Sequence, residues 1–252
     1  TTEMSRISIV VPCYNEAKRF DEGAFARALG EVPSLDFIFV DDGSVDETLA
    51  ILRAFELEHE GRVRVINSPL NLGKSHAVRA GILEAFSGKA AYCGYWDADL
   101  ATPLDELPRF IEVFEAKPEL DLVIGSRVKL LGRSIDRDPW RHYFGRIAAT
   151  VASLVLQLPV YDTQCGAKVF RNSTTTKDLF REPLTSGWVF DVEVIARLIR
   201  QRRDTAMSSA EFSIYELPLR QWHDVAGSKI MIFDYARALV QVLRVWSRHL
   251  RS

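Results

Sequence analysis

The chain has 252 residues, of which 47% are apolar and 26% are charged, and both fractions are close to those of folded soluble proteins. This composition excludes a disordered chain. The 32 basic and 34 acidic side chains give a formal charge of 32 − 34 = −2, so we expect no nucleic-acid partner, because dedicated nucleic-acid-binding proteins are clearly basic.

Short apolar strands alternate with helical segments through the first half of the chain. In chain order we expect a strand at 7–11, a helix at 16–29, a strand at 37–40, a helix ending at 57 and capped by Ser44 or Asp46, a strand at 63–66, a helix from 71 to 86, a strand at 90–96, a helix at 103–115 and a strand at 120–125. This alternation predicts an α/β fold whose mostly parallel sheet is covered by helices on both faces.

Polar residues directly follow several of these strands. Asn15 and Glu16 follow the first, Asp41 and Asp42 the second, and Asp97 and Asp99 the fourth, while Arg127 follows the fifth. In an open parallel sheet the ligand crevice lies beyond the carboxyl ends of the strands, so we expect these side chains to meet at one site.

The motifs in the chain exclude some classes of ligand for this site and favour others. It contains neither the GxGxxG fingerprint of dinucleotide-binding proteins nor the GxxxxGK[ST] loop of P-loop proteins. Asp97-Ala98-Asp99 places two carboxylates at a strand end, which is suited to a hard cation such as Mg²⁺ or Mn²⁺.

Four segments, taken in order, carry a family resemblance: Val10–Glu16, Val40–Ser44, Asn71–Lys74 and Asp97–Asp99. Together they resemble the inverting family-2 glycosyltransferases of the GT-A fold. Later segments are similar to one branch, the dolichyl-phosphate β-glucosyltransferases and other enzymes that make polyprenyl-phosphate sugars: Gly125–Arg127, Asp162–Lys168, Gly187–Glu193 and Gly227–Lys229. The resemblance extends over roughly residues 7–230.

This resemblance implies an enzyme that moves glucose from UDP-glucose to a polyprenyl or dolichyl phosphate with inversion, using Mg²⁺ or Mn²⁺. It implies nucleotide-sugar contacts from Pro12, Tyr14, Glu16, Asp41, Gly73, Lys74, Asp97 and Arg220, with Asp42 as a candidate for orienting its turn. Asp97 and Asp99 are the implied metal ligands, and a third ligand is left open between water and the Thr102 hydroxyl, because Ala101 replaces a glutamine found in related mannose-transferring enzymes.

The acceptor side is implied less completely. Arg127 matches an arginine that meets the acceptor phosphate, with Arg141 or Arg146 as a second, and Lys229 matches a late cation that closes over the donor diphosphate. Asp99, Arg127, Asp191 and Lys229 are thus the expected catalytic residues. Two roles are left open for Asp191. In the first it places the acceptor or the transferred sugar, and in the second it is the base of a transferase that acts on a sugar or lipid hydroxyl. A non-catalytic nucleotide-sugar-binding subunit at a membrane is a further alternative.

Charge and apolar patterning suggest contact with a membrane surface. Residues 127–146 and 218–252 each hold six basic and two acidic side chains. The uncharged stretch 147–158 is expected to be a buried or interfacial helix, and 230–251 an amphipathic helix. No apolar run or signal peptide indicates a membrane span, and three scattered cysteines form no disulfide pattern. We therefore expect a peripheral protein at the cytoplasmic face of a membrane.

A single domain over 1–252 is expected, with a donor-binding half at about 7–126 and an acceptor-side half at about 127–229.

Overall fold

The protein was studied as a computed structural model, which describes residues 5–136, 149–203, 209–223 and 232–251. The first half contains β1 (Ile7–Cys13), α1 (Glu22–Glu31), β2 (Leu35–Asp42), α2 (Thr48–Glu58), β3 (Val63–Ser68), α3 (Lys74–Ser87), β4 (Tyr92–Trp96), the 3₁₀ turn η1 (Leu104–Glu106), α4 (Leu107–Ala116) and β5 (Leu122–Ser126). The second half contains β6 (Ser134–Asp136), a helix at 149–156, β7 (Ala167–Arg171), α6 (Thr174–Leu179), η2 (Gly187–Val189), α7 (Phe190–Arg203), η3 (Ala210–Phe212), β8 (Ile214–Pro218), β9 (Gln221–His223) and α8 (Ile232–His249).

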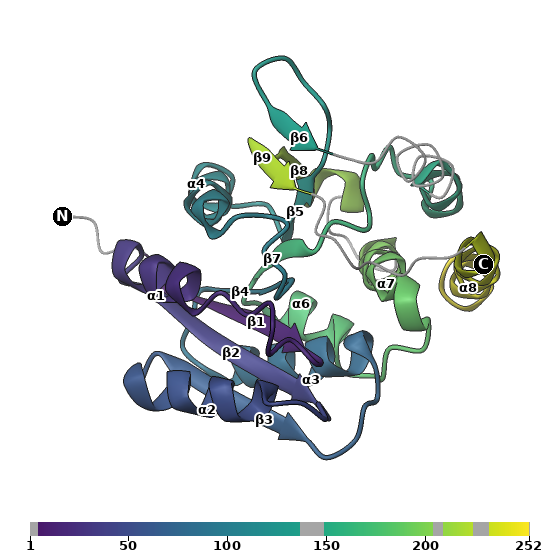
Figure 1. The fold of residues 1–252 in the computed structure, drawn as a ribbon. Coiled ribbons are helices and arrows are strands. Elements are labelled where there is room, and N and C mark those ends of the chain that lie inside the picture. The colour runs from purple at the N-terminus through teal and green to yellow at the C-terminus, as the bar shows by residue number, and fades with distance from the viewer. Residues whose placement is uncertain (1–4, 137–148, 204–208, 224–231, 252) are drawn as a thin grey trace.

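The central sheet has seven strands in the order β3-β2-β1-β4-β7-β5-β8 (Figure 1). Neighbouring strands are parallel except at β7, which runs antiparallel to both β4 and β5. The prediction of a mostly parallel sheet is therefore confirmed. A second, two-stranded sheet pairs β6 with β9 in parallel, and so joins segments that lie more than 80 residues apart in the chain.

Both faces of the sheet are covered, which explains why its inner strands β1 and β4 are buried and largely apolar along their whole length. Along β1, Ile9 and Val11 belong to the hydrophobic cluster that includes residues of α1, α2 and α4, whereas Val10 between them belongs to the cluster on the other face, which includes residues of α3, α6 and α7. Gly81 of α3 allows this second layer to lie close, since a Cβ there would be 2.3 Å from a methyl carbon of Val10. Successive strand side chains point to opposite faces, so two buried faces require apolar residues at every position.

The predicted start of the first helix is wrong. The helix begins at Glu22, where the Asp21 side chain accepts a hydrogen bond from the Ala24 N–H at 2.9 Å, rather than at Glu16. The backbone N–H of Glu16 instead donates to the Thr48 hydroxyl at 2.8 Å. This contact with a distant segment holds the residues after β1 in a loop and outweighs their local helical periodicity.

Helices of the second half pack beside the sheet (Figure 1). In the helix at 149–156, Ala152 and Leu156 are buried, whereas Leu154 is exposed. Helix α8 packs on α7 and buries Ala238, Val242 and Val245, while another side of it leaves apolar residues exposed: Leu239, Val240, Leu243 and Trp246. The amphipathic helix expected at 230–251 is thus found at Ile232–His249. Among the described residues, no helix combines the length and the apolar content needed to cross a bilayer.

Candidate active site

A cleft of about 340 Å³ lies at the carboxyl ends of β1, β2 and β4. Its lining comes from the loops that follow these strands and from the start of α3: Pro12, Cys13, Tyr14, Glu16, Asp42, Asn71, Gly73, Lys74, Ala77, Asp97, Ala98 and Asp99. The predicted convergence of polar strand ends is confirmed for the loops after β1, β2 and β4. Arg127, at the end of β5, does not line this cleft.

The turn after β4 holds two carboxylates in a fixed position. The Asp97 N–H donates to the Gly166 carbonyl at 3.0 Å, the Ala101 N–H donates to Asp99 Oδ1 at 3.1 Å, and Leu100 adopts a positive φ of 51°. Gly166 is required for this packing, since a Cβ there would lie 2.1 Å from Asp97 Oδ2. The turn is therefore positioned by the segment that precedes β7, far away in sequence.

Electrostatics in the cleft favour a bound cation. Burial, and then the nearby charge of Asp97, raise the pKa of Asp99 above its usual range. Lys74 Nζ lies 2.5 Å from Asp97 Oδ1. Removal of water would lower the pKa of Lys74, but the carboxylates of Asp97, Asp191 and Asp99 together outweigh this effect and raise it. Two acids with one lysine leave an excess of negative charge, which a divalent ion would neutralise.

The donor set suits a metal that is completed by ligands from outside the protein. No group of three or more acidic, histidine or cysteine side chains capable of holding a metal occurs within the described parts of the chain. The Thr102 hydroxyl is buried 3.9 Å from the sulfur of Cys165, and Thr102 does not line the cleft. Asp97 and Asp99 therefore fit Mg²⁺ or Mn²⁺ only if water or a substrate phosphate fills the remaining positions.

The two acids after β2 have different environments. Asp42 accepts hydrogen bonds from the N–H groups of Leu72 at 3.0 Å and Gly73 at 2.8 Å, so it orients the loop after β3 rather than its own turn, which was the role expected from the sequence. Asp41 is buried and accepts one hydrogen bond from the Ser44 N–H at 3.3 Å, while its Oδ1 atom has no hydrogen-bond partner among the described residues. A buried carboxylate oxygen without a partner is costly, and a donor from a ligand would satisfy it.

A glycine joins the loops after β2 and β3. Gly43 has a φ of 69°, and a Cβ there would lie 2.6 Å from the backbone of Leu70 and Asn71. The loop after β1 is tied to the same region, because the Asn15 side chain accepts a hydrogen bond from the Val45 N–H at 2.9 Å. These contacts build one wall of the cleft from three loops.

Asp191 lies in the first turn of α7, within a buried polar cluster. Its Oδ1 atom is 2.5 Å from Lys168 Nζ and accepts a hydrogen bond from the Tyr95 hydroxyl. Sequence reasoning missed both partners. Lys168 ends a segment that resembles the family, but no role was inferred for it, and Tyr95 was read only as part of a buried strand.

Arg127 is paired rather than open to the cleft. Its Nε and Nη2 atoms donate to the two oxygens of Asp162 at 2.6 and 2.7 Å, and its guanidinium lies 5.3 Å from the Trp222 ring centroid. Burial would lower the pKa of Arg127, but the charge of Asp162 raises it above its usual value. The side chain is a fixed, permanent cation at the end of β5, and its contact with an acceptor stays a prediction.

The remaining predicted cations are only partly described. Arg220 is exposed between β8 and β9, and its backbone N–H donates to Glu106 at 2.6 Å. Arg141, Arg146 and Lys229 lie outside the described residues.

Comparison with known proteins identifies the family. The profile of the family described as "Glycosyl transferase family 2" matches residues 8–175, which include the cleft and its carboxylate turn. The chain belongs to glycosyl transferase family 2.

Curated family-2 relatives resemble almost the whole chain. It is 30% identical over 250 residues to the dolichyl-phosphate beta-glucosyltransferase of Saccharomyces cerevisiae, an alignment that covers 90% of this chain and 69% of the yeast enzyme. It is 29% identical to the dolichyl-phosphate beta-glucosyltransferase ALG5C of Trichomonas vaginalis, with 94% of this chain and 70% of that protein covered. The chain thus spans about 70% of the length of these relatives.

Solved structures establish the fold of this family-2 chain as GT-A. Glucosyl-3-phosphoglycerate synthase from Mycobacterium tuberculosis, crystallised with Mn²⁺ and UDP-glucose, has a TM-score of 0.65 at 17% identity, covering 97% of this chain and 79% of that one. The mannosyltransferase PcManGT from Pyrobaculum calidifontis, in complex with GDP-mannose and Mn²⁺, has a TM-score of 0.65 at 16% identity, covering 100% of this chain and 66% of that one.

Proposed function

We propose that this glycosyltransferase moves glucose from UDP-glucose to a polyprenyl or dolichyl phosphate, with inversion at the anomeric carbon. The observation that carries the proposal is the Asp97–Asp99 turn beside Lys74 in the cleft, in a chain 30% identical to a dolichyl-phosphate beta-glucosyltransferase. The names of the relatives support glucose and the lipid phosphate as substrates, and the cleft supports a nucleotide diphosphate.

In this proposal the cleft holds the nucleotide through loops that are already ordered. Pro12, Tyr14 and Glu16, which line the cleft, lie along the base and ribose. Asp41 is buried beside the lining residue Asp42, and its unpartnered Oδ1 atom accepts a hydrogen bond from a ring N–H. Gly73, whose N–H is held by Asp42, leaves room for the nucleotide, since nothing lies within 4 Å of a Cβ placed there. These ordered loops reduce the entropy lost on donor binding.

The diphosphate would lie beside Asp97, Asp99 and Lys74. The Lys74 side chain, at the start of α3, is paired with Asp97 but is 40% exposed, so its ammonium can also donate to a phosphate oxygen, and the helix dipole there favours negative charge. A divalent ion held by Asp97 and Asp99 would neutralise charge that develops on the leaving diphosphate. Mg²⁺ and Mn²⁺ both suit this oxygen donor set.

The acceptor would attack as an anion. An oxygen of the lipid phosphate forms a bond to the anomeric carbon from the face opposite the diphosphate, and the bond from that carbon to the diphosphate oxygen breaks. A phosphate monoester is largely ionised near neutral pH, so the attack requires no general base. Arg127 and Arg141 are proposed to attract the acceptor phosphate, and Arg220 and Lys229 to close over the donor diphosphate.

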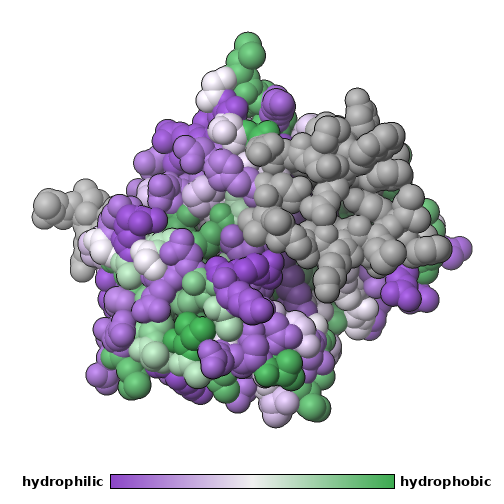
Figure 2. Space-filling model, viewed as in Figure 1, coloured by the Kyte–Doolittle hydropathy of each residue, from purple (hydrophilic) through white to green (hydrophobic). Residues whose placement is uncertain are grey.

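A lipid acceptor implies contact with a membrane surface, which we propose to be the cytoplasmic face. The segment between β5 and β6 supports this contact: Leu131 is fully exposed and Leu130 is 47% exposed, with Lys129 and Arg133 on either side. Figure 2 shows hydrophobic atoms at the tip of this segment, at the top of the molecule. Apolar side chains flanked by cations suit the interface of an anionic bilayer.

The decisive experiment is a transfer assay. Pure protein is incubated with Mg²⁺ or Mn²⁺, a short polyprenyl phosphate and, separately, UDP-glucose, UDP-N-acetylglucosamine or GDP-mannose, and the lipid product is identified by mass. A hexosyl-phospholipid made from UDP-glucose and absent in chelator is the expected result. A product from another donor would refute glucose as the sugar. Metal-dependent nucleotide binding without any lipid product would refute the phosphate acceptor and favour a hydroxyl acceptor.

A further inference from the structure

The ion pair between Lys168 and Asp191 is buried next to the cleft. Lys168 is 1% exposed and Asp191 6% exposed, and Lys168 Nζ also donates to the Cys165 carbonyl at 2.6 Å. The ammonium lies 5.4 Å from the centroid of the Tyr95 ring, and the hydroxyl of that ring donates to Asp191. A buried charge is costly unless it is paired, so these three residues form one unit that folding must keep intact.

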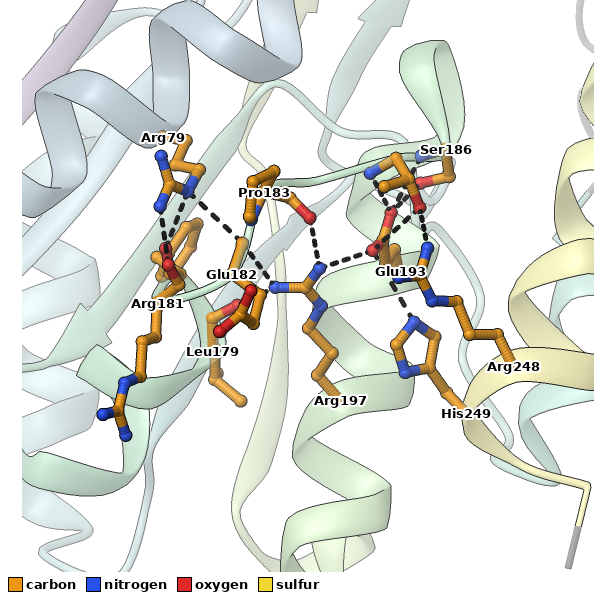
Figure 3. Close-up of polar contacts among 12 residues, drawn as sticks. Arg79, Leu179, Arg181, Glu182, Pro183, Ser186, Glu193, Arg197, Arg248 and His249 are labelled. Carbon is orange, nitrogen blue, oxygen red and sulfur yellow. Dashed lines mark hydrogen bonds and ion pairs between the residues drawn. The ribbon is translucent and has the colours of Figure 1, made fainter.

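This unit is held in place from both sides. Lys168 lies on β7 and Tyr95 on β4, and the two residues face each other in the antiparallel ladder. Asp191 is fixed by the first turns of α7, where Glu193 accepts hydrogen bonds from the N–H groups of Thr185 and Ser186, both at 2.8 Å. Figure 3 shows the network that joins this turn to the rest of the molecule, with Glu193 between Ser186, Arg197 and His249.

The carboxylate of Asp191 is near the donor cleft. Lys168, which pairs with Asp191, donates to the carbonyl of Cys165, and the next residue, Gly166, accepts a hydrogen bond from the Asp97 N–H at 3.0 Å. The ion pair therefore borders the turn that carries Asp97, where Lys74 and Asp97 line the cleft. The negative charge of Asp191 suits hydroxyl groups of a neutral sugar and disfavours an acceptor phosphate.

The same surroundings make Asp191 a poor general base. Its Oδ1 atom is already saturated by an ammonium and a phenol. Uptake of a proton by this carboxylate would weaken the ion pair and leave the Lys168 ammonium less compensated in the core. This argues against the alternative in which Asp191 deprotonates a hydroxyl acceptor.

We propose that Lys168 is a positioning residue that, together with Tyr95, holds the carboxylate of Asp191 in place and directs it at the sugar of the donor. The inference rests on the proposed nucleotide-sugar donor and extends it, because it assigns recognition of the sugar to a buried ion pair rather than to the cleft lining. Asp191 then contacts the substrate, and Lys168 acts only through Asp191.

The test compares affinity for UDP with affinity for UDP-glucose, measured by calorimetry in Mn²⁺ without acceptor. In Lys168→Met we expect UDP affinity to stay within about twofold and UDP-glucose affinity to fall about tenfold, as expected when a charged hydrogen-bonding group is misplaced. Lys168→Arg, which keeps the charge, should recover part of the loss. Tyr95→Phe should also lower the affinity for UDP-glucose relative to that for UDP, but by a smaller factor.

Two further variants separate positioning from stability. Arg202→Met removes another buried ion pair, in which Arg202 Nη2 lies 2.6 Å from Asp121. Asp121 directly precedes β5, at the end of the strand away from Arg127. This variant should lower thermal stability without changing the ratio of the affinities for UDP and UDP-glucose. The double variant Lys168→Met/Asp191→Asn leaves no unpaired charge, so it should fold even if Lys168→Met does not, and it should show the same loss for UDP-glucose.

An unchanged ratio in the folded Lys168 and Tyr95 variants would overturn the inference, as would an equal loss for UDP and UDP-glucose. The binding test uses no acceptor, so it is independent of the lipid phosphate. In one outcome the wild-type protein makes no lipid product, but Lys168→Met still lowers the affinity for UDP-glucose relative to that for UDP. That outcome would refute the proposed acceptor and support the positioning role.

Discussion

Gly166 supports the carboxylate turn from beneath, and adding one methyl group there should disable the enzyme without unfolding it. In Gly166→Ala the new Cβ would lie 2.1 Å from Asp97 Oδ2 and 2.3 Å from its Cγ. Ordinary contact begins near 3.4 Å, so the carboxylate must move by about 3.4 − 2.1 = 1.3 Å. Gly166 does not have a positive φ, so the effect is steric and not a backbone strain.

The magnitude follows from how much room Asp97 has. A displacement of about 1 Å of a group in the reaction site costs on the order of 10²-fold in rate, so we expect kcat/KM to fall about 100-fold. Because Asp97 borders the cleft and can shift toward it, the loss of stability should not exceed the ~1–3 kcal/mol typical of overpacking.

The assay is the initial rate of lipid glucosylation at several Mn²⁺ concentrations, with thermal unfolding measured in parallel. Gly30→Ala is the matched control: Gly30 is exposed at the end of α1 with nothing within 4 Å of its added Cβ, so activity should be unchanged and stability should rise by up to ~1 kcal/mol. Wild-type kcat/KM in a folded Gly166→Ala enzyme would refute the packing argument.

Four other variants test the rest of the site and its scaffold. Asp99→Ala should abolish turnover with an unchanged circular dichroism spectrum, and an active variant with the same metal dependence would contradict the metal role. Arg127→Ala should raise the KM for lipid phosphate more than that for the donor, whereas equal changes would count against an acceptor role; thermal unfolding monitors the lost pair with Asp162. Gly43→Ala should weaken UDP binding and lower stability by about 1–3 kcal/mol, as measured by calorimetry and urea unfolding, because its φ is 69° and backbone atoms lie 2.6 Å from its Cβ. Burial alone would raise the pKa of Glu193, but its hydrogen bonds and ion pairs lower it far below the usual value of about 4.3. The ionised carboxylate therefore stabilises the fold above that pH, and this stabilisation is lost as the pH falls further. The difference in Tm between wild type and Glu193→Gln should shrink on acidification below about pH 4, and a constant difference would refute this.

Much of the donor site could be predicted from the sequence, since it depends on local features. Runs of β-branched residues determine where β1, β2 and β4 end, and parallel strands place their carboxyl ends at one edge. Asp42 and the Asp97–Asp99 pair were found because each lies within a few residues of such an end, whereas Lys74 was found because the segment Asn71–Lys74 resembles the family. The family's motifs added which ligand these residues suit.

The contacts of the acceptor-side residues could not be predicted from local sequence features. Arg127 was correctly located at a strand end, but its pairing with Asp162 depends on how a separate loop returns to the sheet. Lys168 reaches Asp191 only because β7 inserts antiparallel between β4 and β5 and α7 packs behind it.

The sequence by itself determined the class of fold, the edge of the sheet that binds the donor and the acids that face it, because strand and turn preferences are encoded by neighbouring residues. Only the tertiary structure decided that α1 begins at Glu22, that Gly166 supports Asp97 and that Lys168 neutralises Asp191. Each of these depends on a contact between segments far apart in the chain, and such contacts leave no periodic signal in the residues that make them.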